Sequence, residues 1–127
     1  MDEAAVERWL SHYVEAWRSG DPHGIGDLFT EDALYRYHPW DEPTPSHERG
    51  RDAIVASWIE HRDPPGSWTT EYRPWLVGGD RAVVTGTTRY LADDGSVESE
   101  FHNVFFLDFD DEGRCRAFAE IYMKRPE

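Results

Sequence analysis

The sequence has little cysteine, few basic residues and no long apolar run, and each shortage argues against a class of protein. Cys115 is the only cysteine in 127 residues, which excludes an intrachain disulfide framework and a cysteine-rich metal site. Lys and Arg number 13 against 26 Asp and Glu, and the net charge of −13 argues against nucleic acid and anionic membranes as partners. No apolar stretch reaches the length that spans a bilayer.

The N-terminal segment also lacks the features of a secretory leader. Residues 1–8 carry three acids and have neither a basic region nor an apolar core, so we expect a cytoplasmic protein. The length fits one domain over residues 1–127. The composition, 31% charged and 14% aromatic, is that of a folded globular protein.

Helical periodicity is clearest at the start of the chain. Apolar residues recur at helical spacing between Val6 and Trp17, which predicts a helix over about residues 3–19. Asp21-Pro22 has the pattern of a helix cap followed by proline in the first turn, and it predicts a short second helix. The buried side of this helix is expected to comprise Ile25, Leu28 and Phe29. A third helix is expected over about residues 51–61.

Outside the helices the apolar period changes to two, which is typical of strands. An aromatic segment over residues 33–38 predicts a short first strand, and the proline-rich stretch 39–50 predicts a loop. Four longer strands separated by turns are expected over residues 68–77, 81–91, 97–109 and 114–124. Consecutive hairpins make an antiparallel sheet, and the long apolar helix needs that sheet as a partner. The predicted fold is therefore a two-layer α+β domain.

Alternation along the last two strands separates their inner and outer faces. In residues 97–109 the odd positions form the more apolar face, and Asn103 is its one strongly polar member. A buried amide must find hydrogen-bond partners or cost roughly 1–3 kcal/mol, so Asn103 is a candidate functional residue. In the last strand, composition favours as the inner face the one that holds Cys115, Ala117, Ala119, Ile121 and Met123.

Several local patterns are similar, in order and spacing, to those of a known family. The matching stretches are Tyr13–Trp17, Leu28–Ala33, Gly50–Ile54, Gly79–Val84 and Phe109–Arg114. Together they resemble the SnoaL-like branch of the nuclear transport factor 2-like superfamily, which includes ketosteroid isomerases. The resemblance implies a cone-shaped α+β roll, in which three N-terminal helices pack on a curved antiparallel sheet around a pocket. It also implies a homodimer through the outer sheet face, where alternation places Val104 and Phe106.

The resemblance assigns candidate catalytic positions residue by residue. Tyr13 matches the oxyanion-hole tyrosine of the isomerases, and Asn103 is the nearest match to their buried protonated aspartate. Their catalytic aspartate precedes a proline, which places His38 at that position. If the preceding Asp32-Ala33 sets the alignment instead, Tyr37 takes the position, and a one-residue bulge exchanges the two.

The resemblance also reverses the faces of the last strand. It places Phe118, Glu120 and Tyr122 in the pocket, and we adopt this assignment over the one from composition. Asn103 can donate to a developing oxyanion, and a desolvated Glu120 should have a raised pKa. His38 can move a proton near neutral pH.

These residues predict a small-molecule pocket protein. We expect a cofactor-free acid–base enzyme, of isomerase, cyclase or dehydratase type, that acts on a small apolar oxygenated metabolite. The alternatives are a non-catalytic binding or accessory domain, since neither isomerase aspartate is present, and a structural dimer with a filled cone. The residues expected to bind the substrate are Trp17, Tyr37, Trp40, Trp58, Phe105, Phe118 and Tyr122. No metal is expected, because the other histidines lack ligand spacing and are expected at the surface: His12, His23, His47, His61 and His102.

Overall fold

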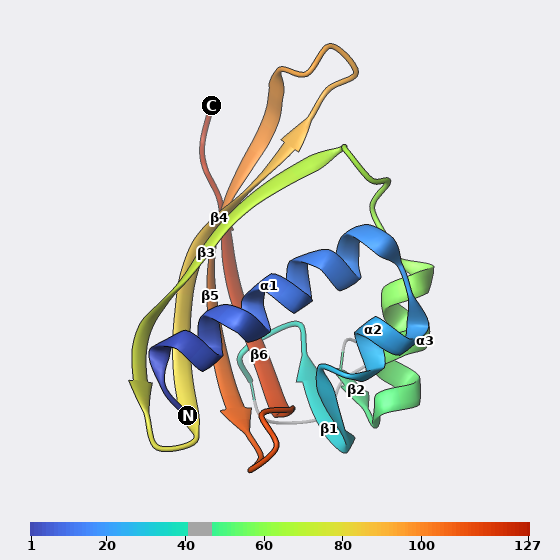
Figure 1. Cartoon of the computed structure of the whole chain (residues 1–127). Helices are drawn as coiled ribbons and strands as arrows, with labels where there is room; N and C mark the ends of the chain where they lie inside the picture. The colour runs from blue at the N-terminus through green and yellow to red at the C-terminus, as the bar shows by residue number, and fades with distance from the viewer. Residues whose placement is uncertain (41–46) are drawn as a thin grey trace.

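The computed structural model describes residues 1–40 and 47–127 and arranges three helices along the inner side of one curved sheet (Figure 1). Helix α1 spans Glu3–Ser19, as predicted, and lies across the concave face of the long strands. Its first turn is capped by the Asp2 carboxylate, which accepts a hydrogen bond from the Ala5 amide. Gly20 ends it at a φ of 67°, a left-handed conformation that favours glycine. Helices α2 (Pro22–Gly26) and α3 (Arg51–Glu60) follow.

The sheet has six strands in the order β2-β1-β6-β5-β4-β3. The four long strands are β3 (Trp68–Gly78), β4 (Arg81–Leu91), β5 (Val97–Phe109) and β6 (Cys115–Lys124). They pair as successive antiparallel hairpins, within one residue of the predicted bounds. Strand β1 (Phe29–Arg36) runs parallel to β6, so the sheet is mixed and the expectation of a purely antiparallel sheet was wrong on this edge.

The first strand and the following loop also differ from prediction. Strand β1 begins at Phe29, four residues earlier than expected, because Phe29 pairs with β6 and buries its ring in the core rather than on a helix. The strand ends at Arg36, so Tyr37 and His38 lie just beyond it. Part of the predicted loop, residues 39–50, forms strand β2 (His47–Arg49), which pairs with β1; residues 41–46 of that loop lie outside the described residues.

The core lies where α1 crosses the sheet. Trp9 packs edge-on against Phe29 and Phe109, and its indole N–H donates to the Leu28 carbonyl at 3.1 Å. Each fully buried aromatic ring of this kind contributes about 1.5–3 kcal/mol. None of these three rings lines the cavity that lies between α1, α3 and the sheet.

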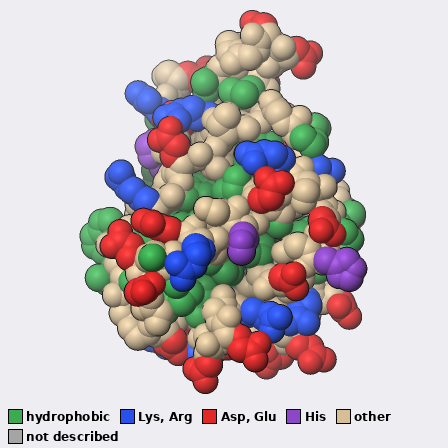
Figure 2. All heavy atoms as spheres, viewed as in Figure 1, with side chains coloured by type: hydrophobic (Ala, Val, Ile, Leu, Met, Phe, Trp, Pro, Cys, Tyr) green, Lys and Arg blue, Asp and Glu red, His purple; other side chains and the backbone are tan. Residues whose placement is uncertain are grey.

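The outer face of the sheet carries Val104, which is half-buried, and Phe106, which is 43% exposed. Ile121 lies opposite Val104 on the same face. Pairing of two copies through this face stays a prediction. On the face of the molecule that Figure 2 shows, acidic and basic side chains are interspersed. No helix in the described part of the chain combines the length and apolarity that a membrane span needs.

Candidate functional site

A cavity of about 320 Å³ opens between α1, α3 and the inner faces of β3 to β6. Its volume lies near the lower end of the roughly 300–1,000 Å³ range of small-molecule sites. Much of its wall is aromatic, with Trp17 from α1, Trp58 from α3 and Trp68 from β3. The wall thus offers a ligand broad apolar surfaces, which a few polar groups interrupt.

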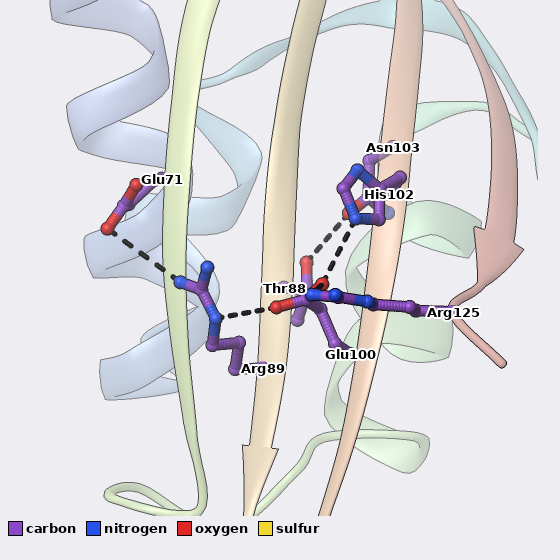
Figure 3. Close-up of polar contacts among 7 residues, drawn as sticks. All are labelled: Glu71, Thr88, Arg89, Glu100, His102, Asn103 and Arg125. Atoms are coloured by element: carbon purple, nitrogen blue, oxygen red, sulfur yellow. Dashed lines mark hydrogen bonds and ion pairs between the residues drawn. The ribbon is translucent and has the colours of Figure 1, made fainter. Parts of the chain in front are cut away.

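A chain of hydrogen bonds crosses the inner face of three strands and ends at the carboxyl group of Glu120. The Asn103 amide nitrogen donates to Glu120 Oε2 at 2.9 Å, and Thr88 Oγ1 donates to Asn103 Oδ1 at 3.0 Å. Since the Thr88 hydroxyl has only one hydrogen, the Tyr72 hydroxyl must donate to it across their 2.6 Å contact. The chain therefore has a fixed direction that turns the amide N–H₂ of Asn103 toward Glu120 (Figure 3 shows the Thr88–Asn103 bond).

Room for this chain depends on Gly86, which pairs with Tyr72 on one side and with Asn103 on the other. A Cβ atom at Gly86 would come within 2.2 Å of the Glu71 carbonyl oxygen and 2.4 Å of the Tyr72 ring. The missing side chain lets the Tyr72 ring lie over the backbone of β4 and reach Thr88.

Glu120 lies deep in the cavity without a cationic partner among the described residues. Desolvation raises the pKa of its carboxyl group, and the hydrogen bond from Asn103 offsets this only in part. Oxygen Oε1 has no hydrogen-bond partner in the described part of the chain. A carboxyl group in this state is suited to exchange a proton with a ligand, because its proton affinity lies closer to neutrality than that of an exposed glutamate.

Tyrosines from four elements surround this carboxyl group. The pKa values of Tyr13 and Tyr35 lie well above the ordinary value, first because of burial and then because of nearby charges that include Glu120. Burial and nearby charges likewise raise the pKa of Tyr90 to about 12, and they raise the pKa of Tyr37 and Tyr72. These phenols therefore stay protonated at neutral pH and serve as hydrogen-bond donors.

The last turn of α3 supplies a second polar group of the wall. The Tyr37 hydroxyl and Ser57 Oγ share a hydrogen bond, and His61 caps the same turn. His61 Nδ1 lies 2.9 Å from the Ser57 carbonyl oxygen, which can only accept, so Nδ1 carries a hydrogen. In the neutral ring, Nε2 is then left as a lone-pair acceptor at the cavity.

The outer face of the same strands holds a contrasting carboxylate. Glu100 Oε1 accepts from Arg89 at 2.8 Å, while Oε2 lies 3.1 Å from His102 and 3.2 Å from Arg125 (Figure 3). His102 and Arg125, followed by Arg89, hold the pKa of Glu100 below its ordinary value. Glu100 is only 12% exposed, but long surface side chains cover it rather than the core, so it loses little hydration.

The structure brings most of the sequence-predicted site residues to this cavity. Three of the four candidate catalytic residues line it, namely Tyr13, Asn103 and Glu120. Four of the predicted substrate-binding residues line it as well, namely Trp17, Tyr37, Trp58 and Tyr122. The inner face of β6 is the one implied by the resemblance, so the choice from composition was wrong. Composition failed there because the polar Glu120 and Tyr122 face a cavity instead of a packed core.

Four predicted residues lie elsewhere. Phe105 and Phe118 are at most 1% exposed and pack against the ring of Tyr13, so they belong to the core behind the wall. His38 stacks on Trp40 with ring centroids 4.4 Å apart, and neither lines the cavity. Trp40 is 51% exposed. Of the two alternatives left open at the end of β1, Tyr37 is the residue that faces inward.

Thr88, Tyr72 and His61 were not predicted as site residues. Inward alternation of β3 and β4 carries a signal for Tyr72 and Thr88, since each is a polar residue in a buried row. His61 is exposed, as expected, but it also lines the cavity, a position that follows from the way the end of α3 packs. His47, also expected at the surface, is half-buried in β2.

An α+β cone that holds an aromatic cavity with a few polar side chains in its wall is the architecture of a class of small pocket proteins. The family model of the SnoaL-like domain matches residues 10–118, so the chain belongs to the SnoaL-like family. No curated protein matches the sequence significantly.

Solved structures agree with this fold. An NTF-2 like protein of unknown function from Burkholderia xenovorans has a TM-score of 0.70 at 17% identity, over 98% of this chain and 88% of that chain. An NTF2-like protein of unknown function from Mesorhizobium loti has a TM-score of 0.61 at 22% identity, over 95% and 93%. A protein with a cystatin-like fold from Methylobium petroleophilum has a TM-score of 0.69 at 18% identity, over 100% and 80%. At these identities the likeness extends to the fold alone.

Proposed function

We propose that this protein is a cofactor-free acid–base enzyme in which Glu120 transfers a proton to or from a small, largely apolar, oxygenated metabolite. The observation that carries the proposal is the carboxyl group of Glu120, desolvated in an aromatic cavity and held, among the described residues, by Asn103 alone. A buried carboxyl without a counter-charge lowers stability, so its presence in a cavity calls for a functional reason.

The proposed reaction is enolisation next to a carbonyl group, which leads to isomerisation, cyclisation or dehydration. Ionised Glu120 takes a hydrogen from the carbon beside the carbonyl. The electron pair of the broken C–H bond forms a C=C bond, and the carbonyl π electrons move to its oxygen. In an isomerisation, protonated Glu120 returns the hydrogen to the γ-carbon of a dienolate while the oxygen electron pair re-forms the C=O bond. In a dehydration the enolate instead expels a β-hydroxyl group, which takes the proton from Glu120 and leaves as water. In a cyclisation the enolate carbon attacks a second carbonyl carbon, whose oxygen takes the proton, so no electrons are gained or lost in any of the three.

Asn103 and Tyr13 are the proposed donors to the developing oxyanion. One hydrogen of the Asn103 amide is held by Glu120, and the other has no partner among the described residues. The Tyr13 phenol keeps its hydrogen at neutral pH because its pKa is raised. Donors aimed at a developing oxyanion contribute about 3–4 kcal/mol each in measured cases, so this pair supports rate enhancement as well as binding.

The proposal is tested by exchange of α-hydrogens for solvent deuterium in a panel of small cyclic ketones, followed by proton NMR. The wild-type protein should accelerate exchange for at least one ketone. Glu120→Gln should lower that rate by about 10²- to 10⁴-fold, which is the usual contribution of a general base. Glu100→Gln is the matched control on the outer face and should leave the rate within twofold of wild type.

The competing function is a binding domain without chemistry, favoured by the absence of the two isomerase aspartates. Binding of the ketones by the wild-type protein without any acceleration of exchange over the uncatalysed rate would establish this competitor. Circular dichroism and the melting temperature of each variant show whether a lost rate reflects lost folding.

A further inference from the structure

The charges around the cavity are of one sign. Among the described residues that line it, Glu120 is the one acidic group, and neither Lys nor Arg is present. Asp63, on the segment that leads from α3 to β3, adds a second carboxylate close to Trp17 and Tyr90. Two basic side chains of neighbouring segments have other partners, since Arg62 donates to backbone carbonyls of α1 and Arg18 pairs with Glu15 and lies over the Trp68 ring. Among the described lining residues, no Lys or Arg offsets the charge of an ionised Glu120.

The same cavity offers aromatic rings from several directions. Trp58 lies edge-on to both Tyr13 and Trp17, with centroids 5.1 and 5.2 Å away, and Tyr35 stacks on Phe118 at 4.2 Å. Aromatic faces carry negative charge in their π systems and attract cations within about 6 Å, most strongly where water is excluded. Rings fixed by their mutual packing need no rearrangement to receive such a group.

We propose that the ligand of this cavity carries a positively charged nitrogen, as an alkyl- or arylammonium group held between Glu120 and the surrounding rings. The inference deepens the proposed function, because it names the class of the substrate: an apolar oxygenated compound that also bears a basic amine. The cation supplies the counter-charge that the protein withholds from Glu120. It also keeps Glu120 ionised, which the proposed proton abstraction requires.

Other titratable groups face Glu120 and enter any test that varies pH. Five of them are phenols that remain neutral below pH 9, namely Tyr13, Tyr35, Tyr37, Tyr72 and Tyr90. Tyr122 and His61 complete the set that lines the cavity. Ionisation of Glu120 favours the bound cation as pH rises.

A matched pair of probes tests the inference. The cation 3-hydroxyphenyltrimethylammonium and the neutral 3-tert-butylphenol have the same shape and differ in one charge. Calorimetric titration of the whole chain at pH 7 should show the cation binding about tenfold more tightly or better, as a desolvated cation–π and charge interaction requires. The preference should fall toward twofold or less in Glu120→Gln, and it should weaken in wild type as pH falls toward 5.

Equal affinity for the two probes, or a preference for the neutral one, overturns the inference. A preference that survives intact in folded Glu120→Gln also overturns it, because the charge of Glu120 would then be irrelevant. The wild-type comparison needs no variant, so it stands even if Glu120→Gln fails to fold. Loss of deuterium exchange in Glu120→Gln without a cation preference leaves the proposed function standing and removes only this inference. A cation preference combined with deuterium exchange that is unchanged in Glu120→Gln leaves this inference standing and removes the proposed function.

Discussion

Glu100 and Glu120 lie on the neighbouring strands β5 and β6, on opposite faces of one sheet, and their surroundings differ. Glu100 is paired with Arg89, Arg125 and His102, and its pKa is lowered. Within residues 1–40 and 47–127, Glu120 has one hydrogen-bond donor, the neutral Asn103 amide, and its pKa is raised. Both groups are largely covered, so coverage alone does not distinguish them. Their partners distinguish them: the cations on the outer face favour the ionised form of Glu100, whereas the neutral amide on the inner face only partly offsets the desolvation of Glu120.

The hydrogen-bond chain on the inner face of the sheet depends on Gly86 and Thr88, and the outer face has no such requirement. On β4, Gly86 and Thr88 face the cavity, while Thr85 and Thr87 face outward. A substitution on the outer face of β4 is therefore a matched control for the same substitution on its inner face.

The largest effect on stability is expected at Gly86. In Gly86→Ala the new Cβ meets backbone atoms, the Glu71 oxygen at 2.2 Å and the Tyr72 Cα at 2.8 Å, so β3 and β4 must separate locally. The free energy of unfolding should fall by about 1–3 kcal/mol, as for other overpacked sites. Gly78→Ala, in the same sheet with open space around its Cβ, should change it by less than about 0.5 kcal/mol. Urea denaturation measures both; equal effects would show that Tyr72 does not need the space at Gly86.

A smaller effect is expected at Thr88. Thr88→Val keeps the shape but leaves Asn103 Oδ1 and the Tyr72 hydroxyl without their partner, which should cost about 1–2 kcal/mol of unfolding free energy. It also frees the Asn103 amide to rotate, so the pH dependence of deuterium exchange should shift upward as Glu120 loses its donor. Thr88→Ser should restore both properties. Thr87→Val on the outer face should have little effect, and an equal loss there would contradict the role of the hydrogen-bond chain.

The two glutamates should affect stability with opposite dependence on pH. Because the pKa of Glu120 is raised, the unfolded chain ionises first as pH rises above about 4.5, and folding is progressively penalised until Glu120 also ionises. Glu120→Gln should therefore gain stability relative to wild type as pH rises. Glu100, with a lowered pKa, stabilises the fold above about pH 4.5 and loses this contribution as pH falls. Glu100→Gln should accordingly lose stability at neutral pH and approach wild type in acid.

Urea denaturation of wild type and of both variants at several pH values between 4 and 8 checks the direction of both stability changes. The matched pair controls for the loss of one charge from a strongly acidic protein. If the stability of both variants relative to wild type changed with pH in the same direction, the predicted difference between Glu120 and Glu100 would be contradicted.

The smallest effect is expected at the histidines. His61 lines the cavity and His38 stacks outside it, so His61→Gln should lower the exchange rate by about 3- to 10-fold and His38→Gln by less than twofold. A larger loss in His38→Gln would return the histidine before Pro39 to the role that the sequence suggested.

The sequence predicted the fold well where one periodicity dominates. Helix α1 and the four long strands follow from regular spacing of apolar residues, and Asn103 stands out as a polar residue in an apolar row. The parallel pairing of β1 with β6 was missed because it joins segments about 80 residues apart and leaves no local pattern. Phe29 fits both a helix face and a strand, and only its partner strand decides between them.

The site was harder to predict than the fold. Glu120 reached the cavity in our prediction through family resemblance, against the composition of its strand, since a residue facing a cavity need not be apolar. His61 carries no signal of its own, because its position depends on where α3 ends and how that end meets the sheet. Phe105 and Phe118 were predicted to line the pocket but lie in the core behind its wall. Alternation identifies the face of the sheet on which a residue lies, but not whether that residue reaches the cavity.

The central claim is that one sheet holds two covered glutamates in opposite states. Carbon-13 NMR of the side-chain carboxyl carbons, titrated from pH 2 to 9 and assigned with Glu120→Gln and Glu100→Gln, measures both groups in one sample. The account predicts that Glu120 titrates above, and Glu100 below, the ordinary value of 4.5. Titration of both groups at the same pH, or of Glu120 below Glu100, would contradict it.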